Sequence, residues 1–236
     1  MEVFFEPIET QKIYLKVVDQ ILELIRAGKF QPGDKLPAER VMAQQMGISR
    51  PAVREAIAAL EIVGILETRP GQGTFITSAD FNGLKSQAYS MLLNERSPFE
   101  ILEVRKVIES YAAAEAANNA APEQIAEIGM AVQSLNDSAV KNQEWNEVAD
   151  RQFHLAVVNA AGNSVLTDLI SILLDMSQQR VWAKLKELGH LVPGSLEKNV
   201  ADHRQIYEAI RARDPEAARN EVLKHFVSVE HDIFDL

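Results

Sequence analysis

The sequence predicts a mainly α-helical protein in two parts, a winged helix-turn-helix over residues 1–77 and an all-α bundle of six or seven helices over residues 97–236. Residues 39–60 contain two short segments of helical periodicity separated by a glycine, and residues 65–77 contain two β-prone runs. From residue 97 onward apolar residues recur at helical spacing and no β pattern is visible. Residues 78–96 are polar and mixed, so we expect a linker with one short helix.

The first part contains the elements of a helix-turn-helix in consecutive order. Glu39–Gln45 predicts a short helix, and Gly47 supplies the tight turn that follows it. Ser49 is placed to cap a second helix, with Pro51 in its first turn, where the missing N–H costs nothing. One face of this second helix is expected to be buried through Val53, Ile57 and Leu60.

Two arginines lie on the opposite face of the second helix. Arg50 and Arg54 are four residues apart, so we expect both to be exposed and to face a DNA major groove. The runs 65–69 and 74–77 are joined by Pro70-Gly71-Gln72-Gly73, which predicts a hairpin with a glycine-rich tip able to approach a DNA backbone. A plain helical corner is the alternative, but turn, cap, arginines and hairpin coincide in the right order.

These residues resemble the signature of GntR-type bacterial transcription regulators. The resemblance implies DNA contacts from Arg40, Arg50 and Arg54 and from the wing glycines Gly71 and Gly73. We expect Arg50 and Arg54 to reach base edges, and Arg40, Ser49 and the wing, Gln72 included, to contact phosphates. The stretches that carry the resemblance are Leu36-Pro37-Ala38-Glu39-Arg40, Ser49-Arg50, Val53-Arg54-Glu55-Ala56 and Gly71-Gln72-Gly73-Thr74-Phe75.

Composition limits the other classes of function. The chain has 236 residues, 47% hydrophobic and 25% charged, and no cysteine, which excludes disulfides, thiolate metal sites and thiol nucleophiles. No apolar run is long enough to cross a bilayer and the N-terminal segment is acidic, so we expect a cytoplasmic protein. The net charge of −10 argues against a nucleic-acid partner, but basic and acidic residues nearly balance between Lys35 and Gly73.

The second part is expected to be helical throughout. Ser97-Pro98-Phe99-Glu100 forms a capping box with proline in the first turn, and Asp214-Pro215-Glu216 is a start signal for the last helix. The expected helices are Ile101–Asn118, Glu123–Asp137, Glu144–Ala161, Ser164–Leu188, Leu196–Ala212 and Pro215–Phe234.

Four polar residues fall on apolar faces of these helices, where burial costs free energy unless they find partners. Asp150 and His154 are one turn apart on one helix, and His203 and His225 lie on two others. Three imidazoles and a carboxylate suit a divalent metal such as zinc, nickel or manganese. A histidine on an apolar face is more often a hydrogen-bonded core residue, so spacing alone leaves both interpretations open. The remaining histidines, His190 and His231, are expected at the surface or in loops.

A second resemblance bears on this cluster. Asp150-x-x-x-His154, Asp202-His203-Arg204 and Lys224-His225 resemble the ligand pattern of the FCD domain, the effector-binding half of the FadR-like branch of GntR regulators. The resemblance implies a metal on Asp150, His154, His203 and His225. It also implies an organic acid held over the metal by an arginine at the position of Arg105.

Two arginines are candidates for binding such an acid. Arg105 and Arg180 each lie on an apolar stripe, which suits bidentate binding of a carboxylate. Internal ion pairs with Glu109 or Asp175, or simple snorkelling, are the alternatives.

Together these features predict a homodimeric, ligand-responsive transcription regulator, a repressor that reads palindromic operator DNA. The stretches 179–185 and 98–102 resemble regulators of hexuronate use, and a lactate-type regulator is the nearest competitor. The rival of another class is a metal-dependent hydrolase, although no general base is evident beyond the metal ligands. A third possibility is a sensor of the metal itself.

Overall fold

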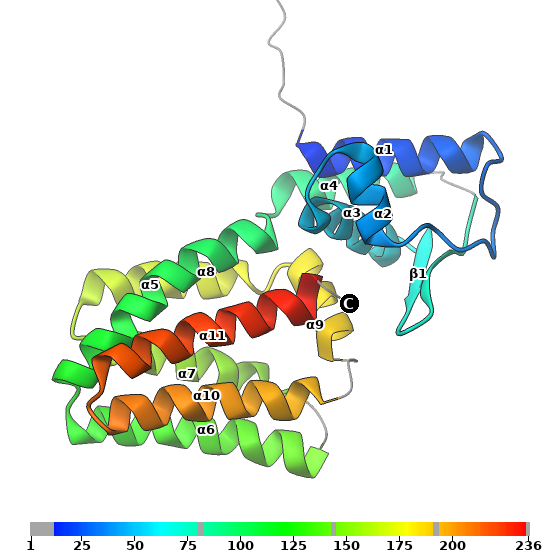
Figure 1. The fold of residues 1–236 in the computed structure, drawn as a ribbon. Helices are drawn as coiled ribbons and strands as arrows, with labels where there is room; N and C mark the ends of the chain where they lie inside the picture. The colour runs from blue at the N-terminus through cyan, green and yellow to red at the C-terminus, as the bar shows by residue number, and fades with distance from the viewer. Residues whose placement is uncertain (1–11, 80–82, 143–144, 191–193, 235–236) are drawn as a thin grey trace, which may run out of the picture. The chain divides into compact units, whose positions relative to one another are not determined.

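The computed structural model describes residues 12–79, 83–142, 145–190 and 194–234 (Figure 1). The chain divides into two units, residues 1–94 and residues 95–236. The fold predicted from the sequence is confirmed, with a winged helix-turn-helix in the first unit and an all-helical bundle in the second. No helix in the described ranges is both long and apolar enough to span a membrane.

The first unit is built around α3, because most of the residues of this helix are buried. Its helices are α1 (Ile13–Arg26), α2 (Glu39–Met46), α3 (Arg50–Ile62) and α4 (Leu84–Asn94). Helix α1 is not among the elements predicted from the sequence, and it packs its apolar face against α3. Helix α4, which falls in the predicted linker, packs against α1 and α3, and the Tyr14 hydroxyl donates to the Leu92 carbonyl at 3.2 Å.

The turn between α2 and α3 forms as expected. Gly47 ends α2 with φ 66° and ψ 35°, a left-handed conformation that glycine adopts without a steric cost. The Ser49 hydroxyl accepts a hydrogen bond from the Ala52 N–H at 3.4 Å and so caps α3, with Pro51 in the first turn.

The wing is a two-stranded antiparallel hairpin of β1 (Leu66–Arg69) and β2 (Gly73–Ile76). Leu66 pairs with Ile76, and both are buried, so the base of the hairpin is fixed by the core. Arg69 pairs with Gly73 at the other end, where the turn projects as a tip.

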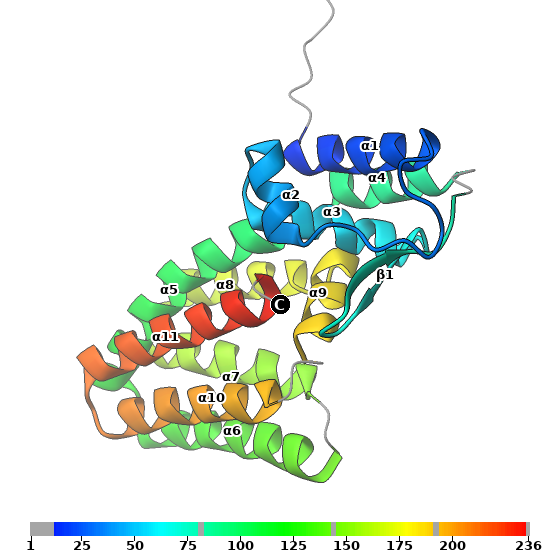
Figure 2. The same ribbon diagram turned by 45° about the vertical axis from the view of Figure 1, so that its right-hand side comes forward.

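The second unit is a bundle in which α5, α7, α6, α10 and α11 pack in succession around a common core (Figures 1 and 2). Helix α8 covers α5 and α7, and α9 packs against α11. The bounds are α5 (Pro98–Asn119), α6 (Pro122–Asn142), α7 (Glu147–Ala160), α8 (Ser164–Met176), α9 (Arg180–His190), α10 (Ser195–Arg211) and α11 (Pro215–Phe234).

One helix prediction for this unit is wrong. The expected helix Ser164–Leu188 is two helices, α8 and α9, with a break after Met176. The break is held by distant residues, because the Val181 N–H donates to a Glu95 carboxylate oxygen at 2.8 Å and the Gln179 side chain accepts from the Arg96 N–H at 2.8 Å. The predicted start of the third helix at Glu144 lies outside the described residues.

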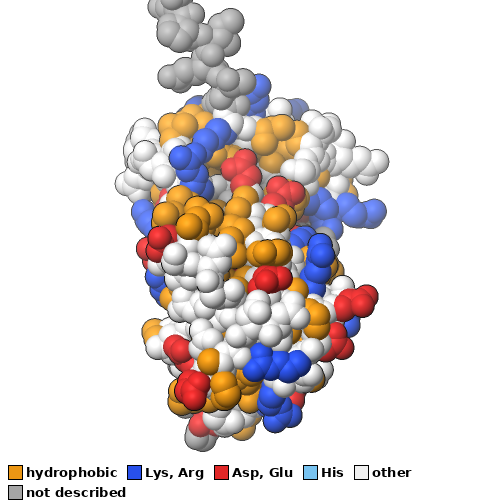
Figure 3. Space-filling model, turned by 90° about the vertical axis from the view of Figure 1, so that its left-hand side faces the viewer, with side chains coloured by type: hydrophobic (Ala, Val, Ile, Leu, Met, Phe, Trp, Pro, Cys, Tyr) orange, Lys and Arg blue, Asp and Glu red, His pale blue; other side chains and the backbone are white. Residues whose placement is uncertain are grey.

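One side of the bundle keeps large hydrophobic side chains exposed. They lie on α5 and on its neighbour α8, and on each helix they recur at the spacing of one helical face. The face shown in Figure 3 carries several hydrophobic side chains among polar ones. The exposed residues are Val104, Val107 and Tyr111 on α5 and Val165, Leu169 and Ile172 on α8.

Candidate metal centre and DNA-binding surface

Most of the residues predicted to contact DNA lie at the surface of the first unit. Arg40 on α2 is exposed, and Arg50 in the first turn of α3 is partly exposed. Gly71 and Gln72 are exposed at the tip of the wing, where a phosphate backbone could approach. Gly73 faces the side chain of Lys35 so closely that an added β-carbon would lie 2.4 Å from its Cε.

Arg54 corrects the sequence prediction. It was expected to be exposed beside Arg50, but it is only 4% exposed. Its Nε donates to Glu39 Oε2 at 2.6 Å, and its terminal nitrogen lies 2.5 Å from the same oxygen. The spacing of residues within α3 carries no information about Glu39, which lies on the preceding helix and binds the Arg54 guanidinium inside the unit. Arg54 therefore ties α2 to α3.

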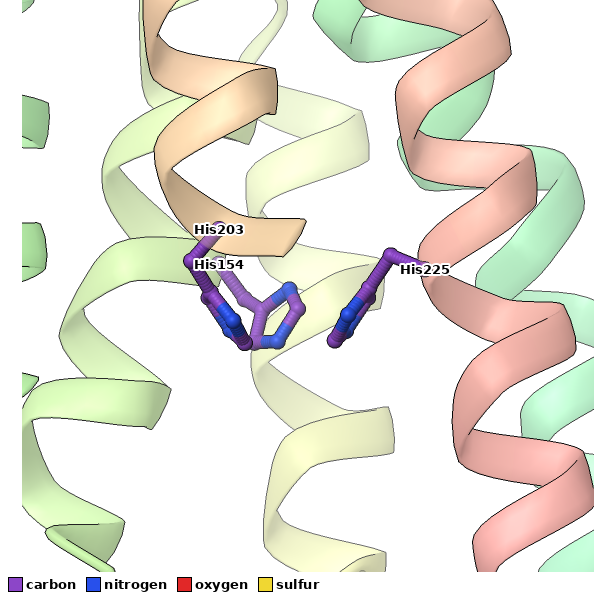
Figure 4. Close-up of side chains that lie close together, drawn as sticks. All are labelled: His154, His203 and His225. Carbon is purple, nitrogen blue, oxygen red and sulfur yellow. The ribbon is translucent and has the colours of Figure 1, made fainter. Parts of the chain in front are cut away.

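Three histidines from three helices converge inside the second unit. His154 of α7, His203 of α10 and His225 of α11 each offer a nitrogen, and these nitrogens lie within 4.8 Å of one another (Figure 4). All three side chains are buried, and His203 is 0% exposed. The residues that the sequence placed on three apolar faces are thus brought together in the fold.

Asp150, the fourth predicted ligand, lies beside this group. Its Oδ1 is 3.2 Å from His203 Nε2 and 3.5 Å from His154 Nε2. Its Oδ2 is 3.4 Å from the Lys186 ammonium. Burial by itself would raise the pKa of Asp150, but the charge of Lys186 and hydrogen bonds with the two histidines hold it well below its usual value.

Second partners orient the imidazoles. His154 Nδ1 lies 2.5 Å from Glu109 Oε2, and His203 Nδ1 lies 2.7 Å from the Asn199 carbonyl oxygen. Each contact leaves Nε2 of the ring directed toward the group of donors. Burial disfavours the charged form of His154, but the negative charge of Glu109 and hydrogen bonds with Asp150 and Glu109 together outweigh it and raise the pKa of this ring. From the sequence, Glu109 was considered only as an ion-pair partner of Arg105.

The donor set fits a divalent metal. His225 Nδ1 is buried without a hydrogen-bond partner among the described residues, a state that costs free energy unless another group completes it. His203 Nε2 is also buried and has an oxygen of the Asp150 carboxylate 3.2 Å away. Burial first, and then the neighbouring imidazoles, hold the pKa of His225 well below its usual value, which favours the neutral form that binds metals. A metal held by these residues would supply a Lewis acid for an oxygen of an anionic ligand.

A pocket of about 490 Å³, its open mouth included, lies beside these residues. Arg105 lines it, with its Nε donating to Glu109 Oε1 at 2.7 Å and its Nη2 buried without a hydrogen-bond partner among the described residues. Arg105 is therefore paired internally and keeps one donor available, and its binding of an acid stays a prediction.

Arg180 is not brought to this pocket. It is exposed at the first residue of α9 and is absent from the described pocket lining. Its expected position assumed one continuous helix with Leu169, and the break between α8 and α9 ends that stripe. Asp175 pairs instead with Arg151 at 2.7 Å.

Several lining residues were not singled out as functional in the sequence. The clearest is His190, expected in a loop or at the surface, which is the last residue of α9 and lies half-buried in the pocket. These residues are identified only because different helices bring them together at the pocket, and the spacing of residues along one helix does not predict that. The others are Trp145, Trp182, Lys186, Asn199 and Asp232.

His190 gives a testable pH dependence. Burial, and then the charge of Lys186, lower the pKa of His190 to about 4 from 6.5. As the pH falls, the His190 imidazole is protonated in the unfolded chain at a higher pH than in the folded protein. The free energy of unfolding therefore decreases between about pH 6.5 and pH 4. In metal-free protein, the loss in unfolding free energy from neutral pH to pH 4 should be smaller in His190→Asn by about 1–3 kcal/mol. Urea unfolding at both pH values measures it, and an equal loss in both proteins would contradict the assignment.

Two family models match the two units. Residues 13–76 match the bacterial regulatory proteins of the gntR family, and residues 100–228 match the FCD domain. FCD domains bind a metal in some members. The second match covers more than half of the 236 residues.

Individual relatives agree with these matches over nearly the whole chain. The Exu regulon transcriptional regulator of Escherichia coli is 32% identical over 96% of this chain and 86% of its own length. The putative L-lactate dehydrogenase operon regulatory protein of Escherichia coli is 33% identical over 93% of this chain and 86% of its own. Among solved structures, Lar of Listeria monocytogenes has the same fold, with a TM-score of 0.50 and 20% identity over 99% of this chain and 100% of that one. The chain belongs to the GntR family of bacterial regulatory proteins, in the group with an FCD domain, and is a ligand-responsive, DNA-binding transcription regulator.

Proposed function

We propose that the chain is a metal-dependent repressor whose FCD domain senses a carboxylated sugar, a hexuronate or a derivative of one. The metal would be zinc, nickel or manganese, held by Asp150, His154, His203 and His225. One observation carries the proposal: His225, whose buried Nδ1 has no hydrogen-bond partner among the described residues, lines the same pocket as Arg105, whose Nη2 is also buried without a partner there. A carboxylate is the ligand group that complements both a cation and a guanidinium.

The proposed DNA contacts all come from the first unit. Arg50 would contact base edges from the start of α3, and Arg40, Ser49 and the wing residues Gly71, Gln72 and Gly73 would contact phosphates. Arg54 is assigned to the core of the unit rather than to DNA, because it is buried against Glu39.

The proposed assembly is a homodimer that acts in the cytoplasm, where each winged unit reads one half-site of a palindromic operator. The exposed hydrophobic side chains of α5 and α8 support this, because large apolar side chains gathered on one side of a domain are typical of a protein interface. A second copy would present the same face, so a two-fold contact buries both at once. Light scattering that returns the mass of one chain would contradict the dimer.

The response to the acid requires a difference in affinity between two states. An acid lowers operator binding only if it binds the DNA-free form more tightly than the DNA-bound form. Arg105 of α5 and the ligands on α7, α10 and α11 lie on different helices, so an acid that contacts all of them can bias how these helices pack.

The test combines binding and release. Metal-loaded protein is screened with D-glucuronate, D-galacturonate and L-lactate by thermal unfolding, and each acid is then added to the protein–operator complex in a gel-shift titration. An effector at about a hundredfold excess over its Kd should stabilise the protein by about 2.7 kcal/mol and release the operator. No stabilisation by any acid, with the metal bound, would overturn the acid-sensing proposal.

Two alternatives are outcomes of the same experiment. A response to lactate alone would favour a lactate regulator, which the similarity to the L-lactate dehydrogenase operon protein keeps open. A change in operator binding with metal alone would indicate a metal sensor. The metal-dependent hydrolase is not favoured, since the gntR family model and the relatives that match nearly the whole chain are those of transcription regulators.

A further inference from the structure

The pocket beside the metal ligands has a second polar wall, formed by Asn199 of α10 and Asp232 of α11. These side chains are 6% and 7% exposed. Asn199 Oδ1 and Asp232 Oδ2 are buried acceptors that have no hydrogen-bond partner among the described residues. A buried acceptor left unpaired costs free energy, so two of them in one pocket indicate groups that a ligand completes.

The surrounding structure contacts the backbone at both positions and one side-chain oxygen of Asp232. Asp232 Oδ1 lies 3.6 Å from Lys198 Nζ and 3.5 Å from His231 Nδ1, which leaves Oδ2 as the oxygen without a partner. Gly189 of α9 packs on this position so closely that an added β-carbon would lie 3.1 Å from the Asp232 carbonyl oxygen. The Asn199 backbone carbonyl accepts from His203 Nδ1, so Asn199 is linked directly to a metal ligand.

The same pocket also contains unpaired donors. The indole N–H groups of Trp145 and Trp182 are buried without a partner among the described residues, as is Nη2 of Arg105. A carboxylate can accept from these donors, but it cannot donate to Asn199 or Asp232. A hydroxyl group both donates and accepts, so it can bridge an indole N–H and one of these oxygens.

We propose that Asn199 and Asp232 are specificity-determining residues that accept hydrogen bonds from two hydroxyl groups of the effector, so that the domain selects a polyhydroxylated acid. This inference rests on the proposed function, because it requires an acid in this pocket. A short acid with a single hydroxyl cannot satisfy both oxygens and leaves at least one buried and unpaired. Sites built to bind a hydroxyl discriminate strongly against ligands that lack it.

The first experiment compares ligands on the unaltered, metal-loaded protein by calorimetric titration. The probes are D-glucuronate and D-galacturonate, L-lactate with one hydroxyl, and hexanoate with none. The expected result is that at least one uronate binds at least about a hundredfold more tightly than lactate, and that hexanoate binds no better than lactate. Equal affinity for lactate and both uronates would overturn the inference and leave the acid-sensing proposal standing. No binding of any probe would overturn both.

The second experiment uses Asn199→Ala and Asp232→Ala, with Glu197→Ala as the control. Glu197 lies two residues before Asn199 on α10, is exposed and is absent from the described pocket lining. Each pocket variant should weaken uronate binding at least about tenfold while lactate affinity and metal content stay unchanged. Glu197→Ala should change uronate affinity less than threefold. Equal losses of affinity for uronate and lactate, or no loss of affinity for uronate, would show that these oxygens do not bind hydroxyl groups of the ligand.

Discussion

Replacing His203 with alanine is expected to abolish tight metal binding and the thermal stabilisation by an acid. His203 is fully buried, its Nδ1 is held by the Asn199 carbonyl, and its Nε2 lies 3.2 Å from Asp150 Oδ1. No other imidazole among the described residues is placed to substitute for it, because His190 and His231 are not in the group of three. Metal affinity should fall by more than about a hundredfold, since loss of a ligand should cost more than the ten- to hundredfold typical of its outer partners.

The measurement is metal content after gel filtration, together with unfolding temperature with and without added metal. His231→Ala is the matched control, because this histidine is 64% exposed and lies on the same helix as His225. The control should keep its metal and the full shift in unfolding temperature. A His203→Ala protein that is folded by circular dichroism and retains stoichiometric metal would contradict the assignment.

Glu109→Gln should also weaken metal binding, but less than His203→Ala does. Glu109 contacts both His154 Nδ1 and Arg105 Nε and is 2% exposed. The amide keeps the shape but removes the charge that orients both partners, so metal affinity is expected to fall about ten- to hundredfold rather than disappear.

Much of the fold was predictable because its signals are local. Asp214 accepts from the Ala217 N–H at 2.9 Å, and α11 spans Pro215–Phe234 as the capping pattern predicts. Gly47 and Ser49 also take the turn and cap positions that their chemistry favours. The break between α8 and α9 was missed because its hydrogen bonds come from Glu95 and Arg96, more than eighty residues away.

The residues of the candidate metal site were also predictable only in part. His154, His203 and His225 were predictable because each is a polar residue on an apolar face, and their convergence agrees with that pattern. The pocket residues Asn199 and Asp232 carry no such signal. Their significance comes from unpaired oxygens facing one cavity, which only the packing of α9, α10 and α11 creates.

Arg54→Ala is expected to destabilise the first unit, by about 3–5 kcal/mol. The substitution leaves the Glu39 carboxylate without its guanidinium in a largely buried position, since the two side chains are 5% and 14% exposed. Breaking a buried ion pair by removing one partner costs about this much, because the remaining charge stays desolvated. Arg40→Ala removes an exposed arginine from the same helix-turn-helix and should change stability by no more than about 0.5 kcal/mol.

The two units can be followed separately in one urea titration. Both tryptophans, Trp145 and Trp182, lie in the second unit, so their fluorescence reports on that unit, whereas far-ultraviolet circular dichroism reports on both. In Arg54→Ala, part of the circular dichroism change should move to lower urea, with the fluorescence transition and metal content unchanged. In a Glu39→Gln background, Arg54→Ala should lower the free energy of unfolding clearly less, because the carboxylate charge that Arg54 neutralises is already absent.

Operator binding then distinguishes a structural role for Arg54 from direct DNA contact. Arg40→Ala should weaken binding of all DNA sequences alike and lower its salt dependence, as expected for a phosphate contact. Arg54→Ala should lose operator affinity only to the extent that the first unit unfolds, so lowering the temperature or adding a stabilising osmolyte should restore it. A stably folded Arg54→Ala protein that still fails to bind operator would instead show that this guanidinium leaves Glu39 and contacts DNA in the complex.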